Sequence, residues 1–249
     1  MTSRSTSIKA VFFDLDDTLF DHLYSTRAGL LAVCAAYPAL QQRPIDVLFA
    51  DYTRLLDEVH VRVLTGELTI DEARRERFRH FFLLHAPEAA DLPAVIEHAA
   101  ILHREHYQAS RQAVVGAAAL LEHLRQQSLK IVVVTNNLVE EQIDKLRHLK
   151  LEHLVDELVT SEEVGFIKPD PRIFQAALER SGCRAEEVVM VGDSWKADVL
   201  GARQAGIRAI WFNRGGLACP NPALALELRA LEPLASAAAA ILSAAISAS

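Results

Sequence analysis

An apolar run that ends in a cluster of carboxylates constrains the fold of this chain most strongly. Residues 8–13 are short, apolar and rich in β-branched and aromatic side chains, which predicts a buried strand. Asp14, Asp16 and Asp17 follow directly. Negative charge beside a buried strand is costly without a cation, and open α/β sheets bind ligands at the carboxyl ends of their strands. We therefore expect a metal site here, with Mg²⁺ as the hard cation that oxygen ligands favour.

Strands and helices alternate from Val114 onward. Four later runs have the length and apolar character of buried strands: 131–134, 158–160, 188–191 and 207–211. Weaker signals predict a strand at 226–228 and a last helix from Pro233. Amphipathic helices separate the stronger runs, including one at 138–149 with Ile143, Leu146 and Leu149 on its apolar face. This alternation predicts an α/β fold whose parallel sheet carries helices on both faces.

A helical segment interrupts this α/β pattern. Residues 22–110 lack strand-like runs and carry apolar residues at helical spacing. Thr69 and Glu72 have the spacing of a capping box, which predicts the start of a helix. We therefore expect two domains, a core formed by 1–21 and 111–249 and an inserted helical domain formed by 22–110.

Composition narrows the classes of partner and compartment. The 249 residues are 51% hydrophobic, which suffices for a core and an inserted domain. The formal net charge is −7 and no Lys/Arg block is present, so we expect no nucleic acid polymer as a partner. Three scattered cysteines suit a reducing compartment. Met1 to Ser7 is polar and the apolar tail is short and broken by serine, so we expect a cytoplasmic protein without a membrane partner.

Polar residues follow three of the predicted strands. Because the carboxyl ends of parallel strands lie on one edge of a sheet, we expect these residues to meet there. They are Asp14 and Asp16, Thr135 and Asn136, and Asp193 and Asp198. The loop before a predicted helix at Pro171, which Asp170 caps and Gly182 ends, can bring Lys168 to the same edge. Carboxylates, a hydroxyl, an ammonium and helix N–H groups suit a phosphoryl group held between Mg²⁺ and a lysine.

The chemistry of phosphoryl transfer assigns catalytic roles. Asp14 is expected to attack phosphorus and form an aspartyl-phosphate. Asp16 would protonate the leaving oxygen and then accept a proton from the attacking water. Thr135 and the N–H group of Asn136 would hold phosphate oxygens, and Lys168 would neutralise charge on the phosphate and the nucleophile.

The metal ligands are expected among the same carboxylates. Mg²⁺ would bind Asp14, Asp193 and the backbone carbonyl of Asp16. Asp198 would either ligate the ion directly or support its ligands. Taken singly, each motif has a plainer interpretation: a solvated turn, a helix cap, a surface lysine, or a carboxylate at a helix N-terminus. Their joint occurrence at strand ends, in this order, favours one site.

Four segments of the sequence resemble the motifs of the haloacid dehalogenase superfamily, in order. They are Asp14-Leu-Asp-Asp-Thr-Leu19, Val134-Thr-Asn136, Lys168-Pro169 and Val191-Gly-Asp-Ser-Trp-Lys-Ala-Asp198. The resemblance implies a Rossmann-like core, with the helical insert as a mobile cap domain of the family's first type. Such a cap would exclude water and contact the rest of the substrate.

Individual motif residues favour one branch of the superfamily. Asp16, together with the pair Asp193 and Asp198, resembles the Mg²⁺-dependent phosphatases more than the metal-free dehalogenases. Asp17 stands where the sugar-phosphate mutases of the superfamily usually have glycine, which argues against a mutase. Ser161-Glu-Glu-Val-Gly165 and Gly66-Glu-Leu-Thr69 resemble the group of pyrimidine 5′-nucleotidases and N-acylneuraminate-9-phosphatase.

The resemblance implies a phosphoric monoester hydrolase that acts on a small phosphorylated metabolite as a monomer or homodimer. A nucleoside 5′-monophosphate is the first expected substrate. A sugar or acid phosphate such as N-acylneuraminate-9-phosphate or phosphoglycolate is the second. Hydrolytic dehalogenation of a 2-haloacid and non-catalytic phosphate binding stay open as alternatives. In the predicted cap, Arg74, Arg75, Arg77 and Arg79 surround one helix, so we expect most of them to form a solvated face.

Overall fold

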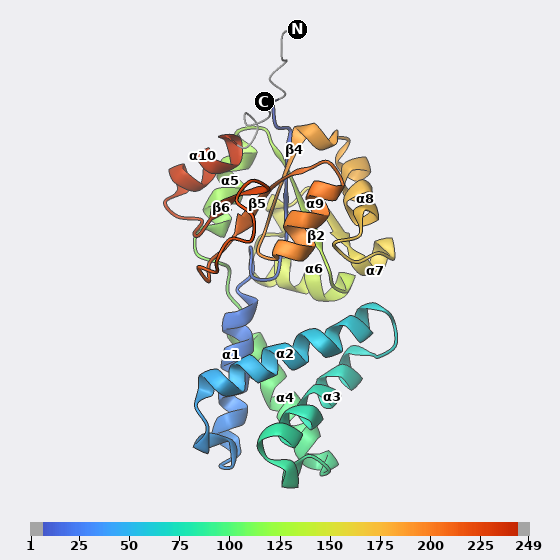
Figure 1. Cartoon of the computed structure of the whole chain (residues 1–249), viewed down its shortest axis with the longest axis vertical. Coiled ribbons are helices and arrows are strands. Elements are labelled where there is room, and N and C mark those ends of the chain that lie inside the picture. Colours follow the sequence, from blue (N-terminus) through green and yellow to red (C-terminus); the bar gives the residue numbers. More distant parts are fainter. Residues whose placement is uncertain (1–6, 244–249) are drawn as a thin grey trace. The chain divides into compact units, whose positions relative to one another are not determined.

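The computed structural model describes residues 7–243 and divides the chain into two compact units. One unit consists of Met1–Asp21 and Gln112–Ser249, and the other of His22–Arg111 (Figure 1). The polar segment that predicted no secretory leader lies, except for Ser7, outside the described residues. Within 7–243, no helix is long and apolar enough to cross a membrane.

A six-stranded parallel sheet forms the centre of the first unit. The strands are β1 (Ala10–Phe13), β2 (Lys130–Thr135), β3 (Glu157–Thr160), β4 (Val188–Gly192), β5 (Arg208–Phe212) and β6 (Ala225–Leu228). Their order is β3-β2-β1-β4-β5-β6, and every neighbouring pair is parallel. The predicted α/β class and all of the predicted strands are confirmed. The strand order places β1 between β2 and β4, where the chain order reverses and open α/β sheets bind ligands.

Helices cover both faces of this sheet (Figure 1). They are α5 (Ala117–Gln126), α6 (Val139–His148), α7 (Ser161–Val164), α8 (Pro171–Ser181), α9 (Gly201–Gln204) and α10 (Leu234–Ser243). On one face, α8 and α9 bury apolar side chains against Phe12, Val134 and Met190 of the sheet. On the other face, α5 packs against β2 and α10. Crossover connections between parallel strands are generally right-handed, so connections that run to opposite sides of β1 place their helices on opposite faces.

The second unit contains four α-helices and, among its described residues, no strand. They are α1 (His22–Ala36), α2 (Ile45–Leu64), α3 (Ile70–His85) and α4 (Pro93–Ala109). An apolar core that includes Leu30, Tyr52 and Phe78 joins them. The predicted capping box is present at the start of α3, where Thr69 and Glu72 bond each other's backbone N–H groups.

Helix α6 differs from the sequence expectation in the side chains it buries. Ile143 and Leu149 are only half-buried, whereas Gln142 and Lys145 are buried beside Leu146. Buried polar groups require partners, and these two find them at the carboxyl edge of the sheet, as described below. Tertiary contacts therefore override the amphipathic pattern of this helix.

Gly201 tests the packing of α8 against α9. A Cβ atom at Gly201 would lie 2.7 Å from the Phe174 ring and 2.9 Å from Cα of Pro169. Helix propensity favours alanine by about 1 kcal/mol, but overpacking a core costs about 1–3 kcal/mol. We expect Gly201→Ala to lower the free energy of unfolding, measured by urea denaturation. The control Gly215→Ala, whose Cβ would approach nothing closer than 3.9 Å, should change it by no more than about 0.5 kcal/mol. Equal effects would contradict this account.

Candidate active site

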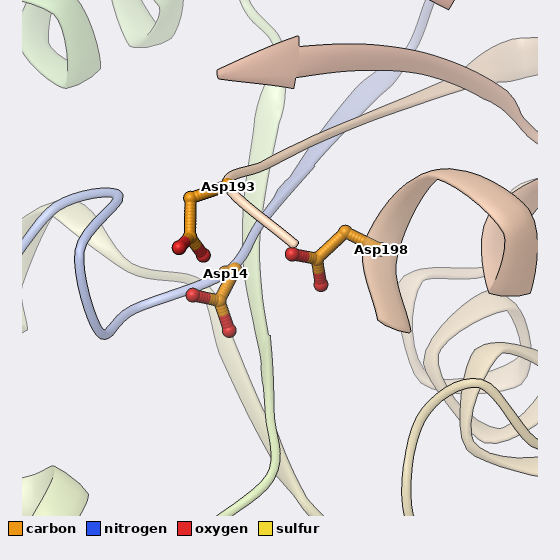
Figure 2. Close-up of side chains that lie close together, drawn as sticks. All are labelled: Asp14, Asp193 and Asp198. Carbon is orange, nitrogen blue, oxygen red and sulfur yellow. The ribbon is translucent and has the colours of Figure 1, made fainter. Parts of the chain in front are cut away.

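Three carboxylates converge at the carboxyl edge of the sheet (Figure 2). Asp14 follows β1, Asp193 follows β4, and Asp198 lies in the π-helical turn Trp195–Leu200. Each contributes an oxygen that lies within 4.8 Å of the others. Asp14 and Asp198 are buried and Asp193 is half-buried. The structure thus brings together three of the carboxylates that the sequence predicted for the metal site.

Close backbone packing after β4 fixes this part of the site. A Cβ atom on Gly192 would lie 2.3 Å from Cγ of Asp198, so only glycine leaves room for that carboxylate. The backbone N–H of Ser194 donates to Asp198 Oδ2 at 2.9 Å. Trp211 on β5 donates its indole N–H to the backbone carbonyl of Asp193 at 2.8 Å.

Lys168 places its ammonium between two of the carboxylates. Its Nζ donates to Asp14 Oδ1 and to Asp198 Oδ1, each at 2.6 Å. A third bond of 2.8 Å reaches the backbone carbonyl of Val134 on β2. An ammonium has three donors, so these bonds use all of them. Both oxygens of Asp198 are also engaged, one by Lys168 and one by Ser194.

Asn136 holds the loop that carries Lys168. Its Nδ2 donates to the backbone carbonyl of Lys168 at 3.0 Å, and the backbone N–H of Lys168 donates to its Oδ1 at 2.6 Å. The sequence assigned only the backbone N–H of Asn136 to phosphate, so the role of this side chain in the loop was missed. The neighbouring Thr135 is buried and accepts a hydrogen bond from Gln142 Nε2 at 2.7 Å.

The side chain of Asp16 points to α6 and is not one of the three converging carboxylates. Lys145 Nζ donates to its Oδ1 at 2.6 Å, while Gln142 Nε2 and Asn137 Nδ2 donate to its Oδ2 at 3.1 and 3.3 Å. None of these three partners was predicted from the sequence. For Gln142 a signal was present, because it stands four residues before the buried Leu146 of the same helix.

Arg214 is a further contact that sequence reasoning missed. It follows β5 and pairs with Asp17 at 3.3 Å and with Asp21 at 2.8 Å. Asp17 has a positive φ of 61°, a conformation that few residues other than glycine adopt. These ion pairs hold the loop after β1 at the same edge of the sheet.

Burial and like charges dominate the electrostatics of the site. Burial raises the pKa of Asp14 to about 7, although Lys168 opposes the shift. Burial and the nearby Asp14 also raise the pKa of Asp193 well above its ordinary value. Burial lowers the pKa of Lys168, but Asp14 and Asp198 outweigh it, so the net shift is upward and the ammonium stays charged. One ammonium faces three carboxylates, and this surplus of oxygen ligands fits a divalent cation such as Mg²⁺.

The arginines of α3 are engaged within the helical unit. Arg74 pairs with Asp71 at 2.7 Å, and Arg75 lies 3.4 Å from Glu97 of α4. The guanidinium of Arg77 lies over the Tyr52 ring, 5.0 Å from its centroid. Arg75 and Arg79 are exposed, whereas Arg74 and Arg77 are half-buried, so two of the four arginines lie on a solvated face.

Comparison with known proteins identifies the family. The family model of haloacid dehalogenase-like hydrolases matches residues 8–206. Glyceraldehyde 3-phosphate phosphatase of Methanothermobacter thermautotrophicus is 34% identical over 207 residues, which cover 83% of this chain and 86% of that protein. Phosphoserine phosphatase of Thermus thermophilus is 32% identical over 239 residues, which cover 89% of this chain and 95% of the relative.

Solved structures share the fold over nearly the whole chain. The putative hydrolase YfnB of Bacillus subtilis, solved bound to magnesium, is 27% identical with a TM-score of 0.72, covering 93% of this chain and 99% of that one. A 2-haloacid dehalogenase from Pseudomonas syringae pv. Tomato is 30% identical with a TM-score of 0.59. The match covers 93% of this chain and 98% of that one. The chain therefore belongs to the haloacid dehalogenase-like hydrolases and is an enzyme of that family.

Proposed function

We propose that this enzyme is a Mg²⁺-dependent phosphomonoesterase that acts through an aspartyl-phosphate on Asp14. The observation that carries the proposal is the placement of Asp14, whose carboxylate lies at the end of β1 with Lys168 at 2.6 Å and beside Asp193 and Asp198. The named phosphatase relatives support the same chemistry.

The geometry supports a two-step reaction. Lys168 holds Asp14 Oδ1 and so orients Oδ2, whose contact with Thr18 Oγ1 is long at 3.4 Å, to attack phosphorus. As the new P–O bond forms, the ester P–O bond breaks, and Asp16, which would take up a proton before this step, gives that proton to the leaving oxygen. Water then attacks the phosphoryl group, Asp16 takes the proton, and inorganic phosphate leaves Asp14. The side chain of Asp16 is 25% exposed, which keeps part of it accessible for this role.

The remaining site residues would bind the phosphate and the metal. The Thr135 hydroxyl and the backbone N–H of Asn136 would hold phosphate oxygens, and Lys168 would neutralise charge. Asp14, Asp193 and the backbone carbonyl of Asp16 would hold the ion, while Asp198, engaged by Lys168 and Ser194, would support it. Bound Mg²⁺ would supply positive charge against the developing charge of the phosphoryl group.

We also propose that the helical insert at 22–110 acts as a cap domain for the core formed by 1–21 and 111–249, with a small phosphorylated metabolite as substrate. Glyceraldehyde 3-phosphate and phosphoserine, which two relatives are named for, are both three-carbon phosphate esters. This supports a sugar or acid phosphate over the nucleoside 5′-monophosphate of the first expectation. Nucleoside monophosphates, the substrates of the pyrimidine 5′-nucleotidases, remain the competing class.

Substitution of the nucleophile tests the chemistry. Asp14→Asn keeps the size of the side chain but removes the attacking charge, so turnover should fall by at least about 10⁴-fold while circular dichroism stays unchanged. Asp46→Asn is the matched control, because the Asp46 side chain is 83% exposed and pairs only with Arg27 among the ion pairs of the described chain. Normal turnover by the Asp14 variant would refute the proposed mechanism.

The raised carboxyl pKa values predict a pH-dependent response to metal. Between about pH 4 and pH 7 the Asp14 carboxyl of the folded protein without metal keeps a proton that it loses in the unfolded chain, so the contribution of this group to stability should fall as the pH rises. Mg²⁺ requires the deprotonated carboxylates. Mg²⁺ at a hundred times its Kd should therefore stabilise the fold by about 2.7 kcal/mol at pH 8, and by much less at about pH 5.5. Thermal unfolding with and without Mg²⁺ measures this, and an equal shift at both pH values would contradict it.

A substrate panel tests the reaction class. Phosphate release would be measured with glyceraldehyde 3-phosphate, phosphoserine, phosphoglycolate, sugar phosphates and nucleoside monophosphates, with Mg²⁺ or with EDTA. We expect EDTA to abolish release and the three-carbon esters to give the highest kcat/KM. Chelator-resistant release of halide from a 2-haloacid, with no phosphate release, would instead establish the dehalogenase alternative.

A further inference from the structure

A buried ammonium on α6 contacts the carboxylate of Asp16. The Lys145 side chain is 4% exposed, and its Nζ lies 2.6 Å from Asp16 Oδ1 and 5.2 Å from the centroid of the buried Phe20 ring. Burying an ammonium is costly unless it is paired. Here the carboxylate and the aromatic face supply the pairing. The ion pair therefore fixes one oxygen of Asp16 in a defined position.

Gln142, one turn earlier on α6, connects Asp16 to Thr135. Its buried Nε2 donates to Asp16 Oδ2 at 3.1 Å and to Thr135 Oγ1 at 2.7 Å. The opposite amide orientation would turn Oε1 toward the Asp16 carboxylate and bring two acceptors together. Because Nε2 donates, Thr135 Oγ1 must accept, and the hydroxyl hydrogen is left to donate to another group such as a phosphate oxygen. In the described structure, Gln142 Oε1 has no hydrogen-bond partner.

We propose that Lys145 and Gln142 are positioning residues for the two steps of the reaction. Lys145 holds the acid–base carboxylate of Asp16 in place, and Gln142 makes the Thr135 hydroxyl a donor toward the phosphoryl group. The inference rests on the proposed function, because it assigns no role to α6 unless Asp16 and Thr135 act as described there. It deepens that function by extending the site to a helix that carries none of the four sequence motifs.

A purely structural role for Lys145 predicts different behaviour. A buried ion pair adds little net stability compared with well-packed apolar residues, so stability alone does not require a lysine at this position. A structural lysine would affect all substrates alike through the amount of folded enzyme. A positioning lysine would affect only the steps in which Asp16 transfers a proton.

The leaving group separates these roles. Nitrophenolate leaves p-nitrophenyl phosphate without a proton, whereas an alkyl ester needs Asp16 to protonate its leaving oxygen. Hydrolysis of the aspartyl-phosphate needs Asp16 as a base in both cases. With Lys145→Met, the alkyl ester with the highest wild-type kcat should therefore lose at least about tenfold in kcat. With p-nitrophenyl phosphate, the first equivalent of nitrophenol should appear quickly and the later ones slowly, as a burst larger than that of the wild type.

Matched variants complete this experiment. Asp16→Asn is the positive control: Lys145→Met should approach its loss of kcat on the alkyl ester and its nitrophenol burst. Lys130→Met is the negative control, because Lys130, at the opposite end of β2 from Thr135, donates to the Ser181 carbonyl. Unfolding of both lysine variants would be followed by circular dichroism. Unchanged alkyl-ester kcat, or equal losses on both esters without a larger burst, would overturn the inference. A wild type inactive on every ester would overturn the proposed function itself, and the inference with it.

A second variant keeps the proposal testable if Lys145→Met fails to fold. Gln142→Met preserves shape but removes the donor to Thr135, so inhibition by inorganic phosphate should weaken by about tenfold, the equivalent of about one hydrogen bond. An unchanged inhibition constant would refute the role of Gln142 in orienting Thr135.

Discussion

The ammonium of Lys168 is the interaction on which the site depends. It joins the end of β1 through Asp14, the carbonyl of Val134 on β2, and the turn after β4 through Asp198. One buried cation thus holds three segments that are distant in the sequence. Removing one partner of such a buried pair typically costs about 3–5 kcal/mol, because the remaining charge is left without compensation. Three carboxylates around one ammonium leave an excess of oxygen ligands at this edge of the sheet, which fits a divalent cation.

The sequence predicted the sheet and the convergence of the motif residues for one physical reason. Parallel topology brings the carboxyl ends of all strands to one edge, so residues that follow strands meet there whatever their separation along the chain. Asp14 and Asp193 directly follow β1 and β4 and are placed by this rule, whereas Lys168 and Asp198 lie further along the segments that leave β3 and β4. The strand signals were strong because buried parallel strands are nearly uniform apolar runs, as in residues 131–134.

No comparable rule of sheet topology predicts the contacts of α6 or those between the loops that carry Asn136 and Lys168. A helix buries whichever side chains find partners, and Gln142 and Lys145 find Asp16 and Thr135, although both are polar. Of the predicted apolar face, therefore, only Leu146 is buried. Likewise, the bonds between the Asn136 side chain and the backbone of Lys168 depend on the approach of two loops, which no periodicity encodes.

The central position of β1 affects how the chain folds during synthesis. β1 is made first, but its neighbours β2 and β4 leave the ribosome only after the whole helical insert. Helical units rich in local contacts fold quickly, and domains generally fold as units during synthesis. The insert therefore folds while both edges of β1 are still unpaired and the carboxylate of Asp14 is hydrated. Lys168 and β4 leave the ribosome after the insert, so the carboxylate of Asp14 can be buried beside its ammonium partner only once they are made.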